Sequence, residues 1–134
     1  LPTMIRKFET ARVNGDAVVP LWGSGTPLRE FLHVDDLAAA CLFMLREANP
    51  PDWANVGSGR EVSIRELAEK VRAATGCTAA IAWDATKPDG TPRKLCDTSL
   101  IRSLGWKPQI DLEEGLARTV ADYRAAVANG TIRL

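Results

Sequence analysis

Four cations stand beside turns or helix ends, where they could bind a phosphate group. Lys7 lies in an apolar-periodic segment, Arg29 follows a Gly-x-Gly turn, and Arg93 and Lys94 end a loop containing proline and glycine. Charged donors held near a turn suit a diphosphate, and arginine can bind one through two parallel hydrogen bonds. Taken singly, each cation could equally be a solvated surface charge. These residues therefore permit a phosphorylated ligand without requiring one.

Trp22 and Asp89 could add contacts to a base or a sugar. Trp22 directly precedes the turn at 23–27, so it could stack on a ligand or end a strand as a core aromatic. Asp89 lies in the loop 84–94 and could accept hydrogen bonds from a base or sugar. An aspartate in a turn more often accepts from its own backbone. Both interpretations remain open at this level.

The usual catalytic patterns do not occur in these residues. Gly23–Gly25 and Gly57–Gly59 are isolated glycine pairs rather than a G-x-G-x-x-G, so dinucleotide binding by this chain alone is not expected. Tyr123 lacks a lysine four positions later, and His33 has no nucleophile at a useful spacing. His33 is instead expected to be a structural residue in a strand. We predict neither a catalytic residue nor a metal site.

Composition gives broad limits on partners and location. Lys plus Arg number 17 and Asp plus Glu number 17 in 134 residues, so a zero net charge favours neither nucleic acid nor an anionic membrane. No apolar run is long enough to cross a bilayer. Three scattered cysteines indicate neither a disulfide framework nor zinc, which favours the cytoplasm. Cys41, among alanines and leucines, is expected to be buried.

Hydrophobic periodicity predicts an α/β chain. Helices are expected at 2–12, 36–47 and 64–75, from about 98 to 104, and from 112 to about 128. Ser63 and Glu66 form a predicted capping box for the third helix, which is expected to end at Gly76, and Asp111 begins a predicted acidic cap for the last. Asp35 is the predicted N-cap of the second helix, whose apolar stripe is Leu37, Cys41, Met44 and Leu45. Strands are expected at 18–22, 30–34, 54–57 and 80–83, and Trp53, Trp83 and Trp106 are expected to pack. These strands are too few for a complete doubly wound sheet, so some are expected to pair outside this chain.

Three stretches together resemble a known family. Residues 22–38 read WGSGTPLREFLHVDDLA, which is similar to the C-terminal region of extended short-chain dehydrogenases acting on nucleotide sugars. Residues 2–8 and the tryptophan before Gly-Ser-Gly-Thr-Pro resemble GDP-L-fucose synthases within that group. Residues 87–97, KPDGTPRKLCD, resemble the same enzymes most specifically. The resemblance extends over nearly the whole chain.

The resemblance implies the substrate-binding C-terminal part of an NADP-dependent enzyme that epimerises and reduces GDP-4-keto-6-deoxy-D-mannose to GDP-L-fucose. It implies that Lys7 and Arg29 face the diphosphate and that Trp22 packs on the nucleotide. Asp89 and Lys94 would hold the ligand from the opposite loop. Residues 1–134 would form this substrate-binding region and include the last elements of an otherwise missing Rossmann domain.

The same resemblance places the family's catalytic residues and most of its NADP contacts before Leu1, so the isolated chain is expected to be inactive. Residues of about 36–58 would pack on the missing cofactor domain, through which the family would form a homodimer. Two alternatives remain open. One is another nucleotide-sugar epimerase or dehydratase, using UDP- or dTDP-sugars. The other is a nucleotide-sugar-binding module without catalysis.

Overall fold

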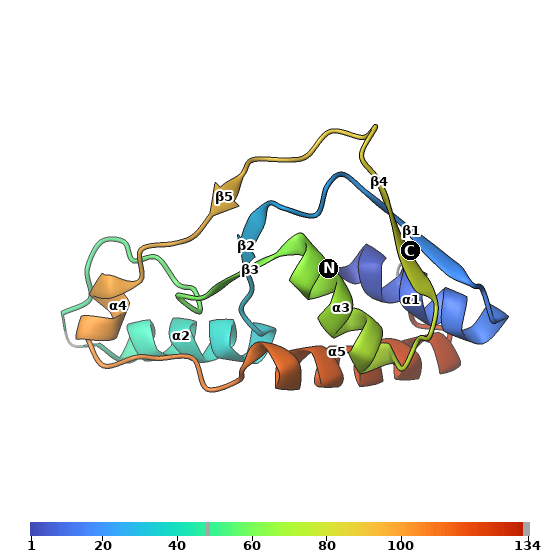
Figure 1. Ribbon diagram of the computed structural model, residues 1–134. Coiled ribbons are helices and arrows are strands. Elements are labelled where there is room, and N and C mark those ends of the chain that lie inside the picture. The colour runs from blue at the N-terminus through green and yellow to red at the C-terminus, as the bar shows by residue number, and fades with distance from the viewer. Residues whose placement is uncertain (48, 133–134) are drawn as a thin grey trace.

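The computed structural model describes residues 1–47 and 49–132, which form a mixed α/β chain (Figure 1). The helices are α1 (Pro2–Asn14), α2 (Val34–Arg46), α3 (Ile64–Thr75), α4 (Ser99–Ser103) and α5 (Leu112–Ala128). The strands are β1 (Val18–Trp22), β2 (Leu28–Glu30), β3 (Glu61–Ser63), β4 (Ala80–Asp84) and β5 (Arg93–Lys94). The predicted α/β class is confirmed. Within the described ranges, no helix is both long and apolar enough to cross a membrane.

The strands form two small sheets. β1 pairs in parallel with β4, from Val18 opposite Ala80 to Trp22 opposite Asp84. β2 lies between β3, its antiparallel neighbour, and β5, its parallel neighbour. Pro20 lacks a backbone N–H and is tolerated because β1 keeps one free edge. The second sheet therefore brings residues near 28, 62 and 93 together.

The main core lies between β1, β4 and three helices. α1, α3 and α5 pack against one another beside the β1–β4 pair (Figure 1). Alternate residues of β1 face this core, because side chains alternate across a strand. The buried side chains are Ile5, Phe8, Ala11, Val19, Leu21, Leu67, Ala68, Val71, Cys77, Ala79, Leu116 and Val120. This layer fixes β1 and the turn that follows it.

The ends of several helices agree with the sequence signals. The capping box of α3 is confirmed: Ser63 Oγ accepts from the Glu66 N–H at 3.1 Å, and Glu66 Oε2 accepts from the Ser63 N–H at 2.8 Å. Asp111 Oδ1 caps α5 by accepting from the Glu114 N–H at 2.8 Å. Gly76 ends α3 with φ of 68°, a left-handed conformation that glycine adopts easily. These contacts join near neighbours, so local sequence was sufficient.

The orientation of α2 differs from the prediction. Its buried residues are Asp36 and Ala40, whereas Leu37, Cys41 and Leu45 of the predicted apolar stripe are exposed. Asp36 explains the difference, because its carboxylate accepts from the backbone N–H groups of residues 109 and 110 at 3.0 and 2.9 Å. Those bonds turn the acidic side of the helix inward. The prediction that Cys41 is buried was therefore wrong.

Five further predictions around α2 were wrong. The second strand ends at Glu30 rather than 34, and residues 54–57 form no strand. His33 is not in a strand; it is the N-cap of α2, where its Nδ1 accepts from the Asp35 N–H at 3.3 Å, so Asp35 is not the cap. Trp53 is 73% exposed instead of packed. Trp106 is buried as expected, against Ala40 and Ile101.

We expect Leu67→Ala to lower the free energy of unfolding by about 2–5 kcal/mol, because Leu67 is 1% exposed in the main core and its truncation leaves a cavity. The matched control is Leu45→Ala on α2, where the side chain is 81% exposed and the expected change is within about 0.5 kcal/mol. Urea unfolding of both variants measures this. Equal losses would contradict the assigned core.

Candidate functional site

A loop from β4 to β5 runs beside the turn that follows β1. The Gly23 N–H donates to the Asp84 carbonyl at 2.9 Å, and the Leu28 N–H donates to the Pro92 carbonyl at 2.8 Å. Figure 1 shows these two segments, the blue turn and the yellow loop, side by side along one edge of the molecule. The predicted site residues Trp22 and Arg29, on the first segment, therefore lie along the same edge of the molecule as Asp89 and Lys94, on the second.

Arg29 and Lys94 are brought together by strand register. They are paired positions of the parallel strands β2 and β5, so their side chains leave the sheet on the same face. Arg29 Nη1 donates to its neighbouring Leu28 carbonyl at 2.6 Å. Among the residues that the structure describes, neither cation forms an ion pair with a carboxylate. Two adjacent positive charges are thus left without a protein counter-ion.

Arg93 shows the opposite arrangement one residue earlier in β5. Its Nε donates to Glu61 Oε2 at 2.8 Å, and this hydrogen bond raises the pKa of the Arg93 guanidinium. Successive side chains of a strand point to opposite faces, so Arg93 and Lys94 face different sides of the sheet. Of the loop's two terminal cations, Lys94 is the one beside Arg29.

Asp89 binds the turn rather than its own backbone. Its Oδ1 accepts from the Ser24 N–H at 2.9 Å, and its Oδ2 accepts from the Ser24 hydroxyl at 2.6 Å. The hydroxyl and then the N–H of Ser24 hold the pKa of Asp89 below its usual range. Both carboxylate oxygens of Asp89 thus accept hydrogen bonds from Ser24, which lies 65 residues earlier in the sequence. The predicted ligand contact of Asp89 remains a prediction.

Trp22 presents its ring to solvent beside the same loop. The side chain is 70% exposed, and Lys87 Nζ lies 5.7 Å from the ring centroid, within the range of a cation–π interaction. Of the two earlier interpretations, a core aromatic is excluded by this exposure. Sequence reasoning did not select Lys87 as a site residue, although it begins the segment 87–97 that carried the resemblance.

Lys7 stands apart from these residues. It projects from α1, and its Nζ donates to the Pro20 carbonyl of β1 at 2.7 Å. Pro20 precedes Trp22 by two positions and leaves β1 on the same face. Lys7 also lines a shallow pocket of about 220 Å³ with Val18 and Pro20. The structure therefore places Lys7 near the strand that carries Trp22, on α1 rather than on the β2–β5 pair that carries Arg29 and Lys94.

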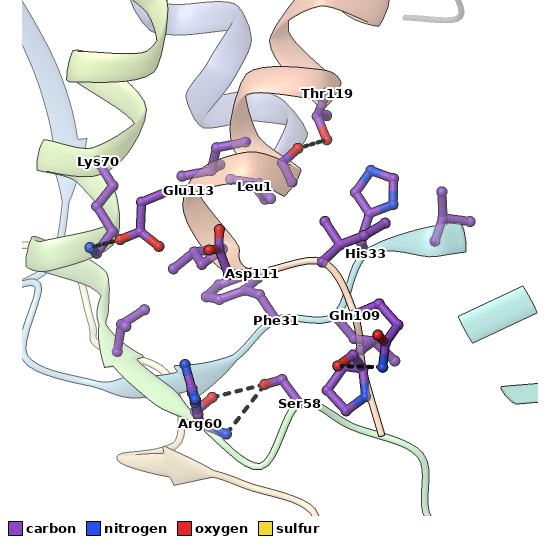
Figure 2. Close-up of a pocket in the computed structure, with 18 of the residues that line it drawn as sticks. Leu1, Phe31, His33, Ser58, Arg60, Lys70, Gln109, Asp111, Glu113 and Thr119 are labelled. Carbon is purple, nitrogen blue, oxygen red and sulfur yellow. Dashed lines mark hydrogen bonds and ion pairs between the residues drawn. The ribbon is translucent and has the colours of Figure 1, made fainter. Parts of the chain in front are cut away.

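A larger cavity of about 740 Å³ lies elsewhere and contains none of the predicted ligand residues (Figure 2). Its walls come from the segment after β2, from the turn before β3 and from the start of α5. Several polar groups in it already have structural partners: Lys70 pairs with Glu113, and Asp111 caps α5. Residues 31–34 belong to the motif 22–38, but the other walls come from segments distant in sequence, so sequence reasoning could not find this cavity.

The glycine turns do not fit a dinucleotide. A dinucleotide-binding turn lets phosphate approach the backbone closely, which requires open space at its glycines. A Cβ placed at Gly23 would lie 2.3 Å from Asp89 Oδ1, and one at Gly57 would lie 2.5 Å from Glu30 Oε1. Carboxylates therefore occupy both positions where a phosphate would need to approach. Among described residues, no cluster of three or more acidic, histidine or cysteine side chains is placed to hold a metal ion.

Comparison with known proteins gives consistent matches. The pattern of the NAD dependent epimerase/dehydratase family matches residues 1–57. GDP-L-fucose synthase 1 of Arabidopsis thaliana is 53% identical over 129 residues, covering 96% of this chain and 40% of that protein. The GDP-L-fucose synthase of Escherichia coli K12 is 43% identical over 129 residues, covering 89% and 40%. A GDP-mannoheptose C4 reductase structure from Campylobacter jejuni, with NADP bound, is 30% identical with a TM-score of 0.81, covering 92% and 44%.

The fold and these matches define an extended short-chain dehydrogenase of the epimerase/dehydratase type. The chain belongs to the GDP-L-fucose synthase family and corresponds to its C-terminal part. It spans about 40% of the length of the relatives that it matches. The resemblance drawn from residues 22–38 and 87–97 is confirmed.

We expect the pKa of Asp89 to lie below its ordinary value of 3.8 and to return towards that value in Ser24→Ala, because the Ser24 hydroxyl stabilises the carboxylate. A depressed pKa stabilises the fold above the unfolded-state pKa, and this stabilisation is lost as the pH falls through the folded-state value. Carboxyl carbon NMR titration measures both proteins. An unchanged Asp89 pKa in Ser24→Ala would contradict the assigned contact.

Proposed function

We propose that this chain is the GDP-sugar-binding portion of an NADP-dependent epimerase-reductase that converts GDP-4-keto-6-deoxy-D-mannose to GDP-L-fucose. The observation that carries the proposal is the pair Arg29 and Lys94, registered on neighbouring strands and, among the described residues, not paired with a carboxylate. Like charges directly opposite each other destabilise a sheet. A ligand anion between them would remove that repulsion. A diphosphate has the charge and the reach to meet both side chains.

The other predicted residues would surround the rest of the nucleotide. Trp22, exposed at the end of β1, offers a flat surface on which a nucleoside could pack. Asp89 lies beside it in the same site, through its contact with Ser24. Lys7 would supply a further positive charge from α1, after releasing the Pro20 carbonyl. In this arrangement the diphosphate lies at Arg29 and Lys94, and the nucleoside lies towards Trp22.

NADP would be bound outside these 134 residues. Carboxylates occupy the space at Gly23 and Gly57, so the chain's own residues do not fit the phosphates of a dinucleotide. When bound, NADPH would supply the hydride for the reduction of the ketone. The chain's residues would hold the GDP part of the substrate, so that the sugar is presented to groups supplied from elsewhere. The ketone makes the neighbouring C–H bonds acidic, so epimerisation then needs only a positioned acid and base.

The exposed side of α2 is the proposed contact for the cofactor-binding domain. Val34, Leu37, Leu42 and Leu45 are exposed along this helix, and Trp53 is exposed just after it. An apolar helix face of this kind usually marks an interface. The relatives are more than twice as long as their match to this chain, which supports the cofactor domain as the occupant. Residues of about 36–58 would therefore pack on that domain.

The assembly and location of the protein follow from the same proposal. Homodimerisation would occur through helices of the cofactor domain and not through these residues. The three cysteines are free thiols in the structure, which supports a reducing compartment, the cytoplasm. Neither statement affects the proposed ligand site.

We expect GDP to bind this chain and UDP to bind it more weakly, with Arg29→Ala or Lys94→Ala weakening GDP binding roughly 10- to 100-fold. That range corresponds to the loss of one hydrogen bond to a charged group, about 1.5–3 kcal/mol. Isothermal titration calorimetry measures all four affinities.

Arg93→Ala is the matched control, because Arg93 adjoins Lys94 but is paired with Glu61. Its effect on GDP affinity is expected to stay within about threefold, the range of an exposed ion pair. Equal losses in Arg93→Ala and Lys94→Ala would contradict a specific phosphate contact. Equal affinity for GDP and UDP would favour the alternative of another nucleotide-sugar enzyme.

The enzymatic part of the proposal predicts NADPH oxidation by the gene product that carries these residues, when GDP-4-keto-6-deoxy-D-mannose is supplied. The product is expected to be GDP-L-fucose. GDP binding without turnover in that protein would instead favour a binding module without catalysis.

A further inference from the structure

We propose that Asp89 is a positioning residue: its two hydrogen bonds to Ser24 hold the loop 85–92 in the shape that places Lys87 over Trp22 and Gly90 beside Arg29. This inference rests on the proposed function of the site. In this role the Asp89 carboxylate bonds to the protein instead of the ligand. The residues that it positions contact the ligand.

The hydrogen-bonding capacity of Ser24 and Asp89 is matched. The Ser24 hydroxyl has one hydrogen, which it donates to Asp89 Oδ2, and its N–H donates to Oδ1. The hydroxyl oxygen then accepts from the Thr26 N–H at 3.1 Å and from the Thr26 hydroxyl at 2.7 Å. Asp89 thus joins an ordered network in the turn, and its oxygens already have donors before any ligand arrives.

The turn is shaped to receive this carboxylate. Gly23 has φ of 81°, a left-handed conformation that disfavours other residues. A Cβ there would lie 2.3 Å from Asp89 Oδ1, so glycine also provides the space that the carboxylate occupies. Both the backbone conformation and the close approach at Gly23 therefore depend on the absence of a side chain.

The contact with Ser24 is what attaches the middle of the loop. Within the part of the chain that the structure describes, the other hydrogen bonds of residues 85–91 go to Asp84, at the start of the same loop. Lys87 precedes Asp89 by two residues, and its Nζ lies 5.7 Å from the Trp22 ring. Gly90 follows Asp89 directly, and a Cβ there would lie 3.2 Å from Arg29 Nη2. Loss of the contact between Asp89 and Ser24 would therefore release Lys87 and Gly90 from their positions beside Trp22 and Arg29.

The test combines amide hydrogen exchange with GDP titration in Asp89→Ala, Ser24→Ala and the double variant. Both single variants are expected to exchange faster at the hydrogen-bonded amides of residues 24, 86 and 87 and to lose at least roughly tenfold in GDP affinity, about 1.4 kcal/mol, because the lost bonds go to an ionised carboxylate. Asp89→Ala removes both hydrogen bonds, whereas Ser24→Ala removes only the one from the hydroxyl, so the double variant is expected to lose no more than Asp89→Ala alone. Ser24→Thr, which keeps a hydroxyl, is expected to restore most of the affinity.

Asp84→Asn is the control, because it removes a carboxylate at the start of the same loop, and in the described part of the chain that carboxylate accepts hydrogen bonds from Thr86 alone. Its GDP affinity is expected to match that of the unmodified chain. Amide exchange of residues 24, 86 and 87 that stays slow in Asp89→Ala would overturn the positioning role. Additive losses in the double variant, or a loss of GDP affinity in Asp89→Ala with unchanged amide exchange, would make Asp89 a ligand contact instead.

The failure of the proposed function gives a different result. If the unmodified chain did not bind GDP while Asp89→Ala still loosened the loop, the contact would exist but the site would be wrong. If GDP bound the unmodified chain and Asp89→Ala equally well, the site would stand and the positioning role would be overturned.

Discussion

The parallel pairing of β2 with β5 is the constraint on which the site depends. It joins residues 65 positions apart in the chain and sets Arg29 opposite Lys94. A shift of one residue would place Arg93 there instead and would send Lys94 to the other face. The bond from the Leu28 N–H to the Pro92 carbonyl fixes this register at its start. The turn after β1 and the loop before β5 then have to run side by side, which brings Trp22, Lys87 and Asp89 together.

The net charge of the chain is zero, yet Arg29 and Lys94 form no ion pair with a carboxylate among the described residues. The roles of several carboxylates explain this. Asp36, Glu30 and Asp89 each accept hydrogen bonds from backbone N–H groups in distant segments. Such bonds satisfy donors in loops that no regular ladder could satisfy. They also leave fewer acidic groups to pair with basic ones. The same acidic residues that shape the loops therefore leave Arg29 and Lys94 available to an external anion.

Local signals predicted the parts of the fold that local interactions determine. The capping box at Ser63 and the cap at Asp111 involve neighbours within a few residues, so the sequence was sufficient for them. The orientation of α2 was not predictable, because it depends on Asp36 meeting the backbone of residues 109 and 110. Residues 54–57 have the composition of a strand, but no described segment pairs with them. Extended segments become strands only when partners are available.

The candidate site was likewise predictable only in part. The resemblance selected Trp22, Arg29, Asp89 and Lys94, and the structure brings their segments together. It did not reveal that Asp89 binds Ser24 or that Lys87 covers Trp22, because both contacts cross between separate loops. Lys7, selected on the same grounds, lies on α1 against β1 instead.

The most direct measurement is a crystal structure of this chain with GDP. The account predicts the diphosphate between the Arg29 and Lys94 side chains, with the nucleoside towards Trp22. A diphosphate found instead in the 740 Å³ cavity beside Arg60 and the start of α5 would contradict it.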